Sequence, residues 1–288
     1  MDTDELQDYL KSLKHTQSTI KSYLFIITRY VKEHPQANSY DYKDIMDYFK
    51  SFLLNVDERP GMALLQSGIK KYYDFLIHTG QIYRHPCRSI CIKQRRKNVI
   101  HVDLFTQFEL ERLLRRHERY AVLKHRNRLV ISLLIYQGLT SSEITSLKVK
   151  DINPDRGVVK IASSLTNSGR KLELKPMQLD LLDKYLNKSR KHLQRQNQEV
   201  LLLNKLGNPM TVDDIHYLIE TYKYLYPDRK LTPQTIRQSV IANWLNKYHI
   251  PLEDAQLLAG HKRPSATLKY KQANIQQAVE TLNRLHPF

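Results

Sequence analysis

Apolar residues recur every three or four positions through most of this chain of 288 residues, and one short stretch breaks that pattern. In residues 158–174, apolar and polar side chains alternate on both sides of the polar turn 166–169. Alternation around such a turn is typical of a β-hairpin, whereas the longer recurrence is typical of amphipathic helices. The sequence therefore predicts a mainly α-helical fold with a small β-sheet, of the α+β class.

The first eighty or so residues predict four amphipathic helices joined by short polar connections. The second begins after the capping residues Thr16 and Ser18, the third opens near Asp41, and the fourth stops at Gly80. Their apolar stripes are Leu6, Leu10 and Leu13; Ile20, Tyr23, Ile27, Tyr30 and Val31; Ile45, Phe49 and Phe52; and Leu65, Ile69, Tyr72, Tyr73 and Leu76. We expect residues 1–92 to form a small helical domain.

A basic run without glycine follows this domain and lacks helical periodicity. Its cations are Lys93, Arg95, Arg96 and Lys97. We interpret residues 93–104 as an interdomain linker and residues 105–288 as a second domain. Such a run can follow a phosphate backbone and add salt-dependent affinity, or it can be a solvated hinge.

Helical periodicity resumes in the second domain. The predicted helices cover residues 109–117, 120–137, 142–147 and 177 to about 195, and residues 200–203 are an apolar strand or a buried segment. Thr232 is the expected N-cap of a helix that starts with Pro233, and Pro251 and Pro264 open later helices. A last helix over residues 274–285 carries Ile275, Val279, Leu282 and Leu285 at helical spacing.

The chain is strongly basic, with 46 Lys and Arg against 29 Asp and Glu, a net charge of +17 and a pI near 9.7. This excess favours a polyanionic partner, and nucleic acid leads because no apolar run approaches the length of a membrane span. The acidic N-terminus is unlike a signal peptide, so we expect a cytoplasmic protein without a membrane partner. A basic RNA-binding or ribosome-associated protein is an alternative from another class.

The two cysteines, Cys87 and Cys91, lie near His85 and His101, which raises the question of a metal site. Zinc sites usually combine closely spaced ligand pairs with a longer gap between the pairs, a spacing absent here. We expect a reduced, buried cysteine pair and no metal.

Three segments of the second domain carry residues suited to phosphoryl transfer. Arg237 lies one turn into the helix that starts at Pro233, His261 follows Gly260 at a helix end, and Tyr270 comes nine residues later. This arrangement resembles the tyrosine recombinase, or phage integrase, family, in which H-x-x-R precedes G-H and a tyrosine nine residues beyond that histidine. The resemblance includes residues 136–144 and 257–270, the hairpin and the N-terminal helices, and so spans nearly the whole chain.

The resemblance implies a SAM-like, core-binding helical domain that contacts DNA, followed by an integrase-type catalytic domain. In the family a tyrosine attacks a DNA phosphodiester, giving a 3′-phosphotyrosine and a free 5′-hydroxyl without a metal or cofactor. Two arginines stabilise the charge on the phosphate, histidines position it and move protons, and a hairpin lysine is the acid for the leaving oxygen.

Carried over by position, Tyr270 matches the nucleophile, Arg237 the second arginine and His261 the histidine between them. Glu143 matches the acidic residue three positions after the first arginine. The first three have a simpler interpretation too: Tyr270 as a packed aromatic residue, Arg237 as a phosphate contact without catalysis, and His261 as a histidine stabilised by the helix dipole.

Three positions depart from the family pattern. Thr140 stands where the first arginine is expected, and Gln234 replaces the histidine three residues before Arg237. The hairpin lysine is expected near Ser164 or Leu165, and the possible supporting cations, Arg170 and Lys171, occur only across the turn. Loss of the first arginine alone predicts a rate lower by at least about 10²- to 10³-fold, by analogy with removing an oxyanion-hole donor.

Two functions follow from this resemblance. The first is a site-specific recombinase or integrase of a mobile element, working through Tyr270 at reduced activity, in which the protein self-associates on double-stranded DNA of the nucleoid. The second is a catalytically inactive DNA-binding protein that assists or regulates a companion recombinase. The terminal helix could mediate self-association or pack within the chain.

Overall fold

A computed structural model of the protein describes residues 3–54, 61–92, 104–194 and 198–271. The chain divides into two compact units, residues 1–97 and 98–288, and each is considered by itself. The basic cations of the predicted linker, Lys93, Arg95, Arg96 and Lys97, lie outside the described residues. The predicted terminal helix over residues 274–285 lies outside them as well.

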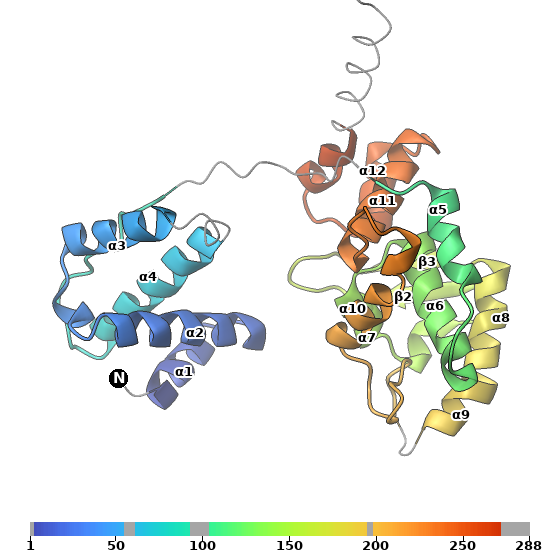
Figure 1. Cartoon of the computed structure of the whole chain (residues 1–288), viewed down its shortest axis with the longest axis horizontal. Coiled ribbons are helices and arrows are strands. Elements are labelled where there is room, and N and C mark those ends of the chain that lie inside the picture. Colours follow the sequence, from blue (N-terminus) through green and yellow to red (C-terminus); the bar gives the residue numbers. More distant parts are fainter. Residues whose placement is uncertain (1–2, 55–60, 93–103, 195–197, 272–288) are drawn as a thin grey trace, which may run out of the picture. The chain divides into compact units, whose positions relative to one another are not determined.

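The N-terminal unit contains the four predicted helices (Figure 1). They are α1 (Thr3–Ser12), α2 (Gln17–Glu33), α3 (Tyr42–Leu54) and α4 (Met62–His78), with a 3₁₀ turn η1 (Ala37–Ser39) between α2 and α3. The Thr16 hydroxyl caps α2 by accepting the amide of Thr19 at 3.3 Å. Asp41 does the same for α3 by accepting the amides of Lys43 and Asp44. Local capping chemistry therefore begins these helices where the sequence predicts.

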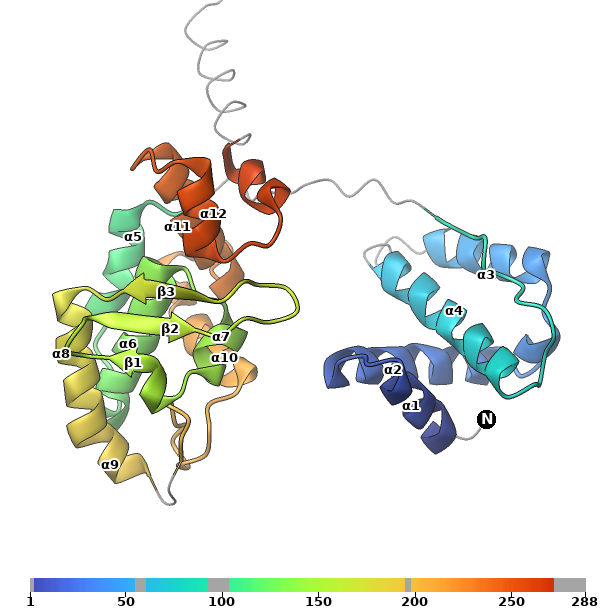
Figure 2. The same cartoon turned by 180° about the vertical axis from the view of Figure 1, so that it is seen from behind.

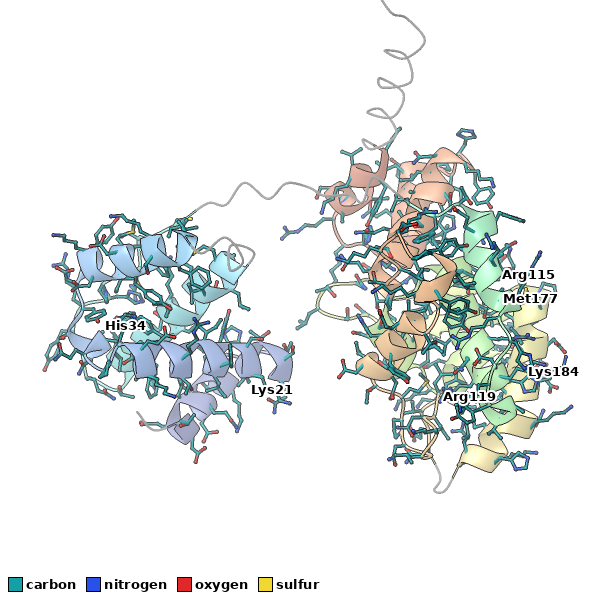
Figure 3. All side chains as sticks on the ribbon, in the orientation of Figure 1. Lys21, His34, Arg115, Arg119, Met177 and Lys184 are labelled. Atoms are coloured by element: carbon teal, nitrogen blue, oxygen red, sulfur yellow. The ribbon has the colours of Figure 1, made fainter. Side chains whose placement is uncertain are left out.

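Aromatic and aliphatic side chains together form the core of this unit. The hydroxyls of Tyr30 and Tyr73 lie 2.9 Å apart, and Tyr73 donates to the carbonyl of Ala37 at 2.7 Å. His34 lies between α2 and α3, where its Nδ1 is 3.0 Å from the Tyr40 hydroxyl (Figure 3). The expectation for Leu13 was wrong, because α1 ends at Ser12 and the Leu13 side chain is exposed.

The two cysteines differ in environment and do not form the expected buried pair. Cys87 is buried, and burial raises the pKa of its thiol to about 12, whereas Cys91 is exposed. The His85 ring accepts the Cys87 amide at 3.2 Å. Within the described ranges, no three side chains of the metal-binding types gather into a potential site.

The second unit is also mainly helical, with its elements shown from two sides in Figures 1 and 2. Its helices are α5 (Gln107–Arg112), α6 (Ala121–Gln137), α7 (Ser141–Ser146), α8 (Pro176–Lys184), α9 (Arg190–Leu193), α10 (Val212–Glu220), α11 (Pro233–Asn246) and α12 (Leu252–Ala259). Short 3₁₀ turns η3 (Leu113–Arg115), η4 (Val149–Asp151) and η6 (Lys223–Leu225) occur between them, and residues 264–271 are helical. None of the described helices is long and apolar enough to cross a lipid bilayer.

Two predicted helices differ in detail from the observed ones. The helix expected over residues 109–117 starts earlier, because Thr106 forms a capping box with Glu109, and it tightens to the 3₁₀ turn η3 after Arg112. The helix expected from residue 177 contains a π-helical segment η5 (Tyr185–Ser189) between α8 and α9. The side chain of Lys184, at the end of α8, projects outward (Figure 3).

The predicted hairpin is present and belongs to a three-stranded antiparallel sheet with order β1-β2-β3. The strands are β1 (Ile152–Asn153), β2 (Val158–Ile161) and β3 (Arg170–Glu173). Val159 pairs with Leu172 and both are buried, whereas Lys160 pairs with Lys171 on the exposed face. The sheet lies against α6, and the β2–β3 loop extends beyond it on the side away from α8 and α9 (Figure 2).

Apolar side chains from the helices and the inner face of the sheet form the main core, and a smaller cluster lies between α11 and α12. Leu201, Leu202 and Leu203 are fully buried in the main core, and Val200 and Leu203 form isolated bridges to Lys148 and Pro209, so this is a buried segment rather than a strand of the sheet. Gly138 ends α6 with φ +59° and turns the chain toward α7. The candidate site is built around this turn.

Candidate active site

Thr140 occupies the position where the family pattern has an arginine, and there it stabilises the start of α7. It is the N-cap of α7, with its hydroxyl accepting the amide of Glu143 at 3.2 Å. In return, the Glu143 carboxylate accepts the amide of Thr140 at 2.9 Å. This reciprocal capping box fixes the start of α7 and aims the Glu143 carboxylate inward.

Glu143 and Arg170 form a buried ion pair between α7 and β3. Nη1 of Arg170 lies 2.6 Å from Oε1, Nη2 lies 3.3 Å from Oε2, and the Arg170 side chain is 2% exposed. Burial alone would raise the pKa of Glu143, but the Arg170 hydrogen bonds, the Thr140 amide and the charge of Arg237 together lower it. Glu143 is therefore ionised, and it neutralises one of the two guanidinium groups nearby.

Arg237 extends from the second turn of α11 into the same region. Its Nη1 donates to the carbonyl of Gly138, and its Nη2 donates to the carbonyl of Ala259 at 2.7 Å. Nη1 is also 4.0 Å from Oε2 of Glu143. Burial lowers the Arg237 pKa and the Glu143 charge raises it, yet a guanidinium stays protonated at any physiological pH.

His261 follows Gly260, which ends α12 in a left-handed conformation with φ +72°. Its Nδ1 lies 2.8 Å from the hydroxyl of Thr267, which is buried in the helical segment 264–271. Burial and the charges of Arg237, Arg170 and Lys269 lower the His261 pKa to about 4. At neutral pH this imidazole is uncharged and available for hydrogen bonding.

Tyr270 lies in the same helical segment and packs against the small cluster of α11 and α12 that includes Ile241 and Ala255. The side-chain amide of Asn246 donates to its carbonyl at 3.4 Å. Burial raises the Tyr270 pKa, and the nearby charge of Arg237 lowers it by a smaller amount. The phenol is therefore protonated at rest, and Arg237 is the neighbour that favours its ionised form.

The structure thus brings Tyr270, Arg237 and His261 together electrostatically, and it adds Arg170 and Glu143 to the group. Gln234 is exposed on the first turn of α11, and Lys171 is exposed on the outer face of β3, opposite Lys160. Of the two possible supporting cations, Arg170 alone points into the site, and its Nε is engaged with the carbonyl of Leu258 at 2.8 Å.

The β2–β3 loop is fastened to the site by residues that the sequence did not single out. Asn167 donates to Oε1 of Glu143 at 3.1 Å and forms a β-bridge with His261, and Ser168 donates its amide to the carbonyl of Gly260 at 2.8 Å. Nζ of Lys262 donates to the carbonyl of Leu165 at 3.1 Å. In the sequence, the polar composition of the turn and the position of Lys262 next to His261 were the available signals. Neither indicates that the turn contacts a segment so distant in the sequence.

Chemically, the arrangement combines a tyrosine hydroxyl, a neutral imidazole, two guanidinium groups and one carboxylate. The charges of Arg170 and Glu143 offset each other, so Arg237 contributes the uncompensated positive charge beside Tyr270. A cation in that place favours an anionic ligand such as a phosphodiester and a phenolate nucleophile.

Comparison with known proteins gives the same classification. The model of the phage integrase family matches residues 103–277, more than half of the chain. The chain is 24% identical to tyrosine recombinase XerC of Staphylococcus epidermidis over 99% of this chain and 98% of the relative. It is 25% identical to tyrosine recombinase XerD of Staphylococcus haemolyticus over 98% of each.

A solved structure of the XerH site-specific recombinase bound to difH substrate, a pre-cleavage complex, is similar in fold. The TM-score is 0.71 at 19% identity, covering 97% of this chain and 84% of that one. The fold expected from the sequence, a helical N-terminal domain with an integrase-type catalytic domain, is thus confirmed. From the family match over more than half of its length, the chain belongs to the phage integrase, or tyrosine recombinase, family.

Proposed function

We propose that this protein binds duplex DNA and cleaves and rejoins its strands at specific sites through Tyr270, at a reduced rate. The observation that carries this proposal is a shared location: Arg237 donates to the carbonyl of Ala259 at 2.7 Å, and Tyr270 packs against the cluster that contains Ala259. His261 follows two residues after Ala259, and the charge of Arg237 lowers the pKa of both His261 and Tyr270. The phenolic oxygen attacks phosphorus, forming a 3′-phosphotyrosine and releasing a 5′-hydroxyl, and the reverse attack rejoins strands. Arg237 stabilises the charge on the non-bridging oxygens.

The reduced rate follows from the positions of the cations. Thr140 caps α7 and contributes no positive charge, and Arg170 is already bonded to Glu143 and to the carbonyl of Leu258. Gln234 can donate a hydrogen bond to a phosphate but cannot exchange protons. The phosphate is then stabilised by one uncompensated guanidinium group instead of two. This difference lowers the rate of strand cleavage by at least about 10²- to 10³-fold.

A second candidate is a DNA-binding partner of a competent recombinase without strand cleavage of its own. A specific observation favours it: both guanidinium groups of the site donate to groups of the protein itself. Arg237 bonds the carbonyls of Gly138 and Ala259, and Arg170 bonds Glu143 and Leu258. Such arginines would be retained for the fold even after turnover was lost.

The DNA-binding part of the proposal rests on the net charge of +17 and on the fold. In this view residues 1–92 are the core-binding domain, and the linker cations Lys93, Arg95, Arg96 and Lys97 follow the phosphate backbone. The protein works on DNA of the nucleoid as an assembly with itself or with a companion recombinase. Neither a metal nor a cofactor takes part in the step.

Trapping of a covalent intermediate tests catalysis directly. A nicked substrate that contains the natural site releases a short oligonucleotide after cleavage, so the Tyr270 adduct accumulates and can be measured after denaturing electrophoresis. We expect a slowly formed adduct that Tyr270→Phe abolishes. Specific binding of the same DNA without any adduct over long incubation would favour the accessory function instead.

A further inference from the structure

The proposed reaction leaves an alkoxide that must acquire a proton. When the bond between phosphorus and the 5′-oxygen breaks, its electron pair stays on an oxygen that is a poor leaving group unless it is protonated. This point rests on the proposed cleavage at Tyr270. It raises the question of which side chain of this chain supplies the proton.

The residues assigned so far are unsuited to that task. His261 has a pKa lowered to about 4 by burial and neighbouring charges, so it carries no extra proton at neutral pH. Arg237 and Arg170 hold their protons too tightly to act as acids, and their donors face protein carbonyls and a carboxylate. An ammonium group is the remaining common acid, and its pKa falls readily in a changed environment.

Lys262 carries an ammonium to the tip of the β2–β3 loop. Its Nζ donates to the carbonyl of Leu165 at 3.1 Å, next to the place where the sequence lacks a hairpin lysine. The surrounding backbone holds the two segments together, because Asn167 bridges to His261 and the Ser168 amide bonds the Gly260 carbonyl at 2.8 Å. The lysine thus approaches the loop from the segment that also carries His261.

We propose that Lys262 is the acid that protonates the leaving 5′-oxygen. Tyr270 Oη forms the bond to phosphorus, the bond from phosphorus to the 5′-oxygen breaks, and that oxygen takes a proton from Lys262 Nζ. The phenolic proton passes to solvent, from which the resulting amine is reprotonated. In the free protein the hydrogen bond to Leu165 holds the ammonium at the loop until DNA offers the leaving oxygen.

A substrate with sulfur in place of the bridging 5′-oxygen tests this role, because a thiolate leaves without protonation. Wild-type, Lys262→Met and Lys262→Arg proteins are compared on oxygen and sulfur substrates by the rate of adduct formation. On the oxygen substrate we expect both variants to be about 10²-fold slower or more, within the range of general-acid catalysis. On the sulfur substrate both should match the wild type, and Lys160→Met, on the outer face of β2, should match it on both.

Other outcomes overturn the proposal in distinct ways. An equal loss on both substrates means that Lys262 only fastens the loop, and full activity of Lys262→Arg on the oxygen substrate means that charge suffices. A defect relieved by sulfur in Lys269→Met instead of Lys262→Met assigns the acid to Lys269, whose charge lowers the His261 pKa. If the wild type gives no Tyr270-dependent adduct even with sulfur, the proposed cleavage itself fails, and the role of Lys262 fails with it.

Discussion

Arg170 and Glu143 form an ion pair with a 2.6 Å contact between Nη1 and Oε1, and this pair joins the sheet to the helix that starts after the left-handed turn at Gly138. Both side chains are at most 7% exposed. The pair positions the β2–β3 loop and limits the positive charge that remains for a bound phosphate. Its strength can be measured because the single tryptophan, Trp244, lies in α11 of the same unit.

Removal of one partner should destabilise the second unit strongly. In Arg170→Met the carboxylate of Glu143 stays buried without its main partner, and such a loss typically lowers the free energy of unfolding by about 3–5 kcal/mol. Urea unfolding followed by Trp244 fluorescence in the full chain measures the effect. Lys171→Met, on the exposed face of the same strand, is the matched control and should change the unfolding free energy by less than about 0.5 kcal/mol. Equal effects of the two substitutions would contradict the ion pair's role.

Gly260 should tolerate a methyl group far less well than Gly157. Both glycines have positive φ, +72° and +61°, so alanine is strained at each by about 1–2 kcal/mol. At Gly260 a Cβ would also overlap Nη1 of Arg170 and lie 2.9 Å from its Cζ, whereas at Gly157 its nearest neighbours are 3.8 Å away. We expect Gly260→Ala to lower the free energy of unfolding by about 1–3 kcal/mol more than Gly157→Ala does. The Trp244 unfolding assay compares the two, and similar losses would show that the Arg170 guanidinium moves aside.

The lowered pKa of His261 predicts a loss of stability in acid. Its folded-state pKa of about 4 lies below the ordinary value of 6.5, so between these pH values the unfolded chain binds more protons than the folded one. Unfolding free energy should therefore fall as pH drops from 6.5 toward 4, by on the order of 1–3 kcal/mol for this residue. His261→Asn should flatten the profile in that window, leaving a smaller slope from His85 and His125, whose pKa values are also lowered. His192→Asn, at an exposed histidine of the same unit, is the matched control substitution.

Restoring the missing arginine should accelerate strand cleavage. Thr140→Arg places a guanidinium where the resemblance expects one, and we expect adduct formation with the nicked substrate to rise by about 10²- to 10³-fold. The substitution also removes the capping hydroxyl of α7, at a stability cost of about 1 kcal/mol. Ser142→Arg adds the same charge on the exposed side of α7 and should not raise the rate. An unchanged rate in Thr140→Arg would mean that charge at this position does not limit the reaction.

DNA binding should weaken steeply as the salt concentration rises. The linker cations should account for a defined part of the slope of log affinity against log salt. Replacement of Lys93, Arg95, Arg96 and Lys97 by glutamine should reduce the slope of log affinity against log salt by about 3–4, if each cation contacts one phosphate. The control removes equal charge through Lys124 in α6, Lys184 in α8, Lys188 in η5 and Lys191 in α9. Helices α8 and α9 lie on the side of the sheet away from the β2–β3 loop (Figure 2). A fluorescence-anisotropy titration at several salt concentrations gives both slopes. Equal slopes for the two variants would argue for a solvated hinge.

The sequence predicted the elements whose cause is local. Thr16 and Thr232 cap their helices as expected, and Gly138 ends α6, because each effect depends on a few neighbouring residues. The hairpin was found from its alternation, but β1, with two residues, is too short to produce a pattern. The π-helical segment η5 and the early start of α5 depend on packing and capping details that periodicity does not reveal.

The sequence indicated which residues lie near one another in the candidate site, but it did not indicate which hydrogen bonds and ion pairs they form. The spacing of Arg237, His261 and Tyr270 identified residues that the structure brings together. Arg170 and Lys171 could not be told apart, because a shift of one residue in hairpin register exchanges the faces of the sheet. The partnership of Arg170 with Glu143 joins positions 27 apart in the sequence, and only the folded arrangement of β3 and α7 creates it.

Arg237 also serves as a shared end-cap, since its two bonded carbonyls belong to the C-terminal ends of α6 and α12. Those ends carry partial negative charge, which a guanidinium offsets. A descendant of such an enzyme that no longer cut DNA would still need this arginine in order to fold. Among relatives of this chain, a retained Arg237 is therefore a poor indicator of enzymatic activity, and an arginine at the position of Thr140, which the α7 cap does not require, is the more informative one.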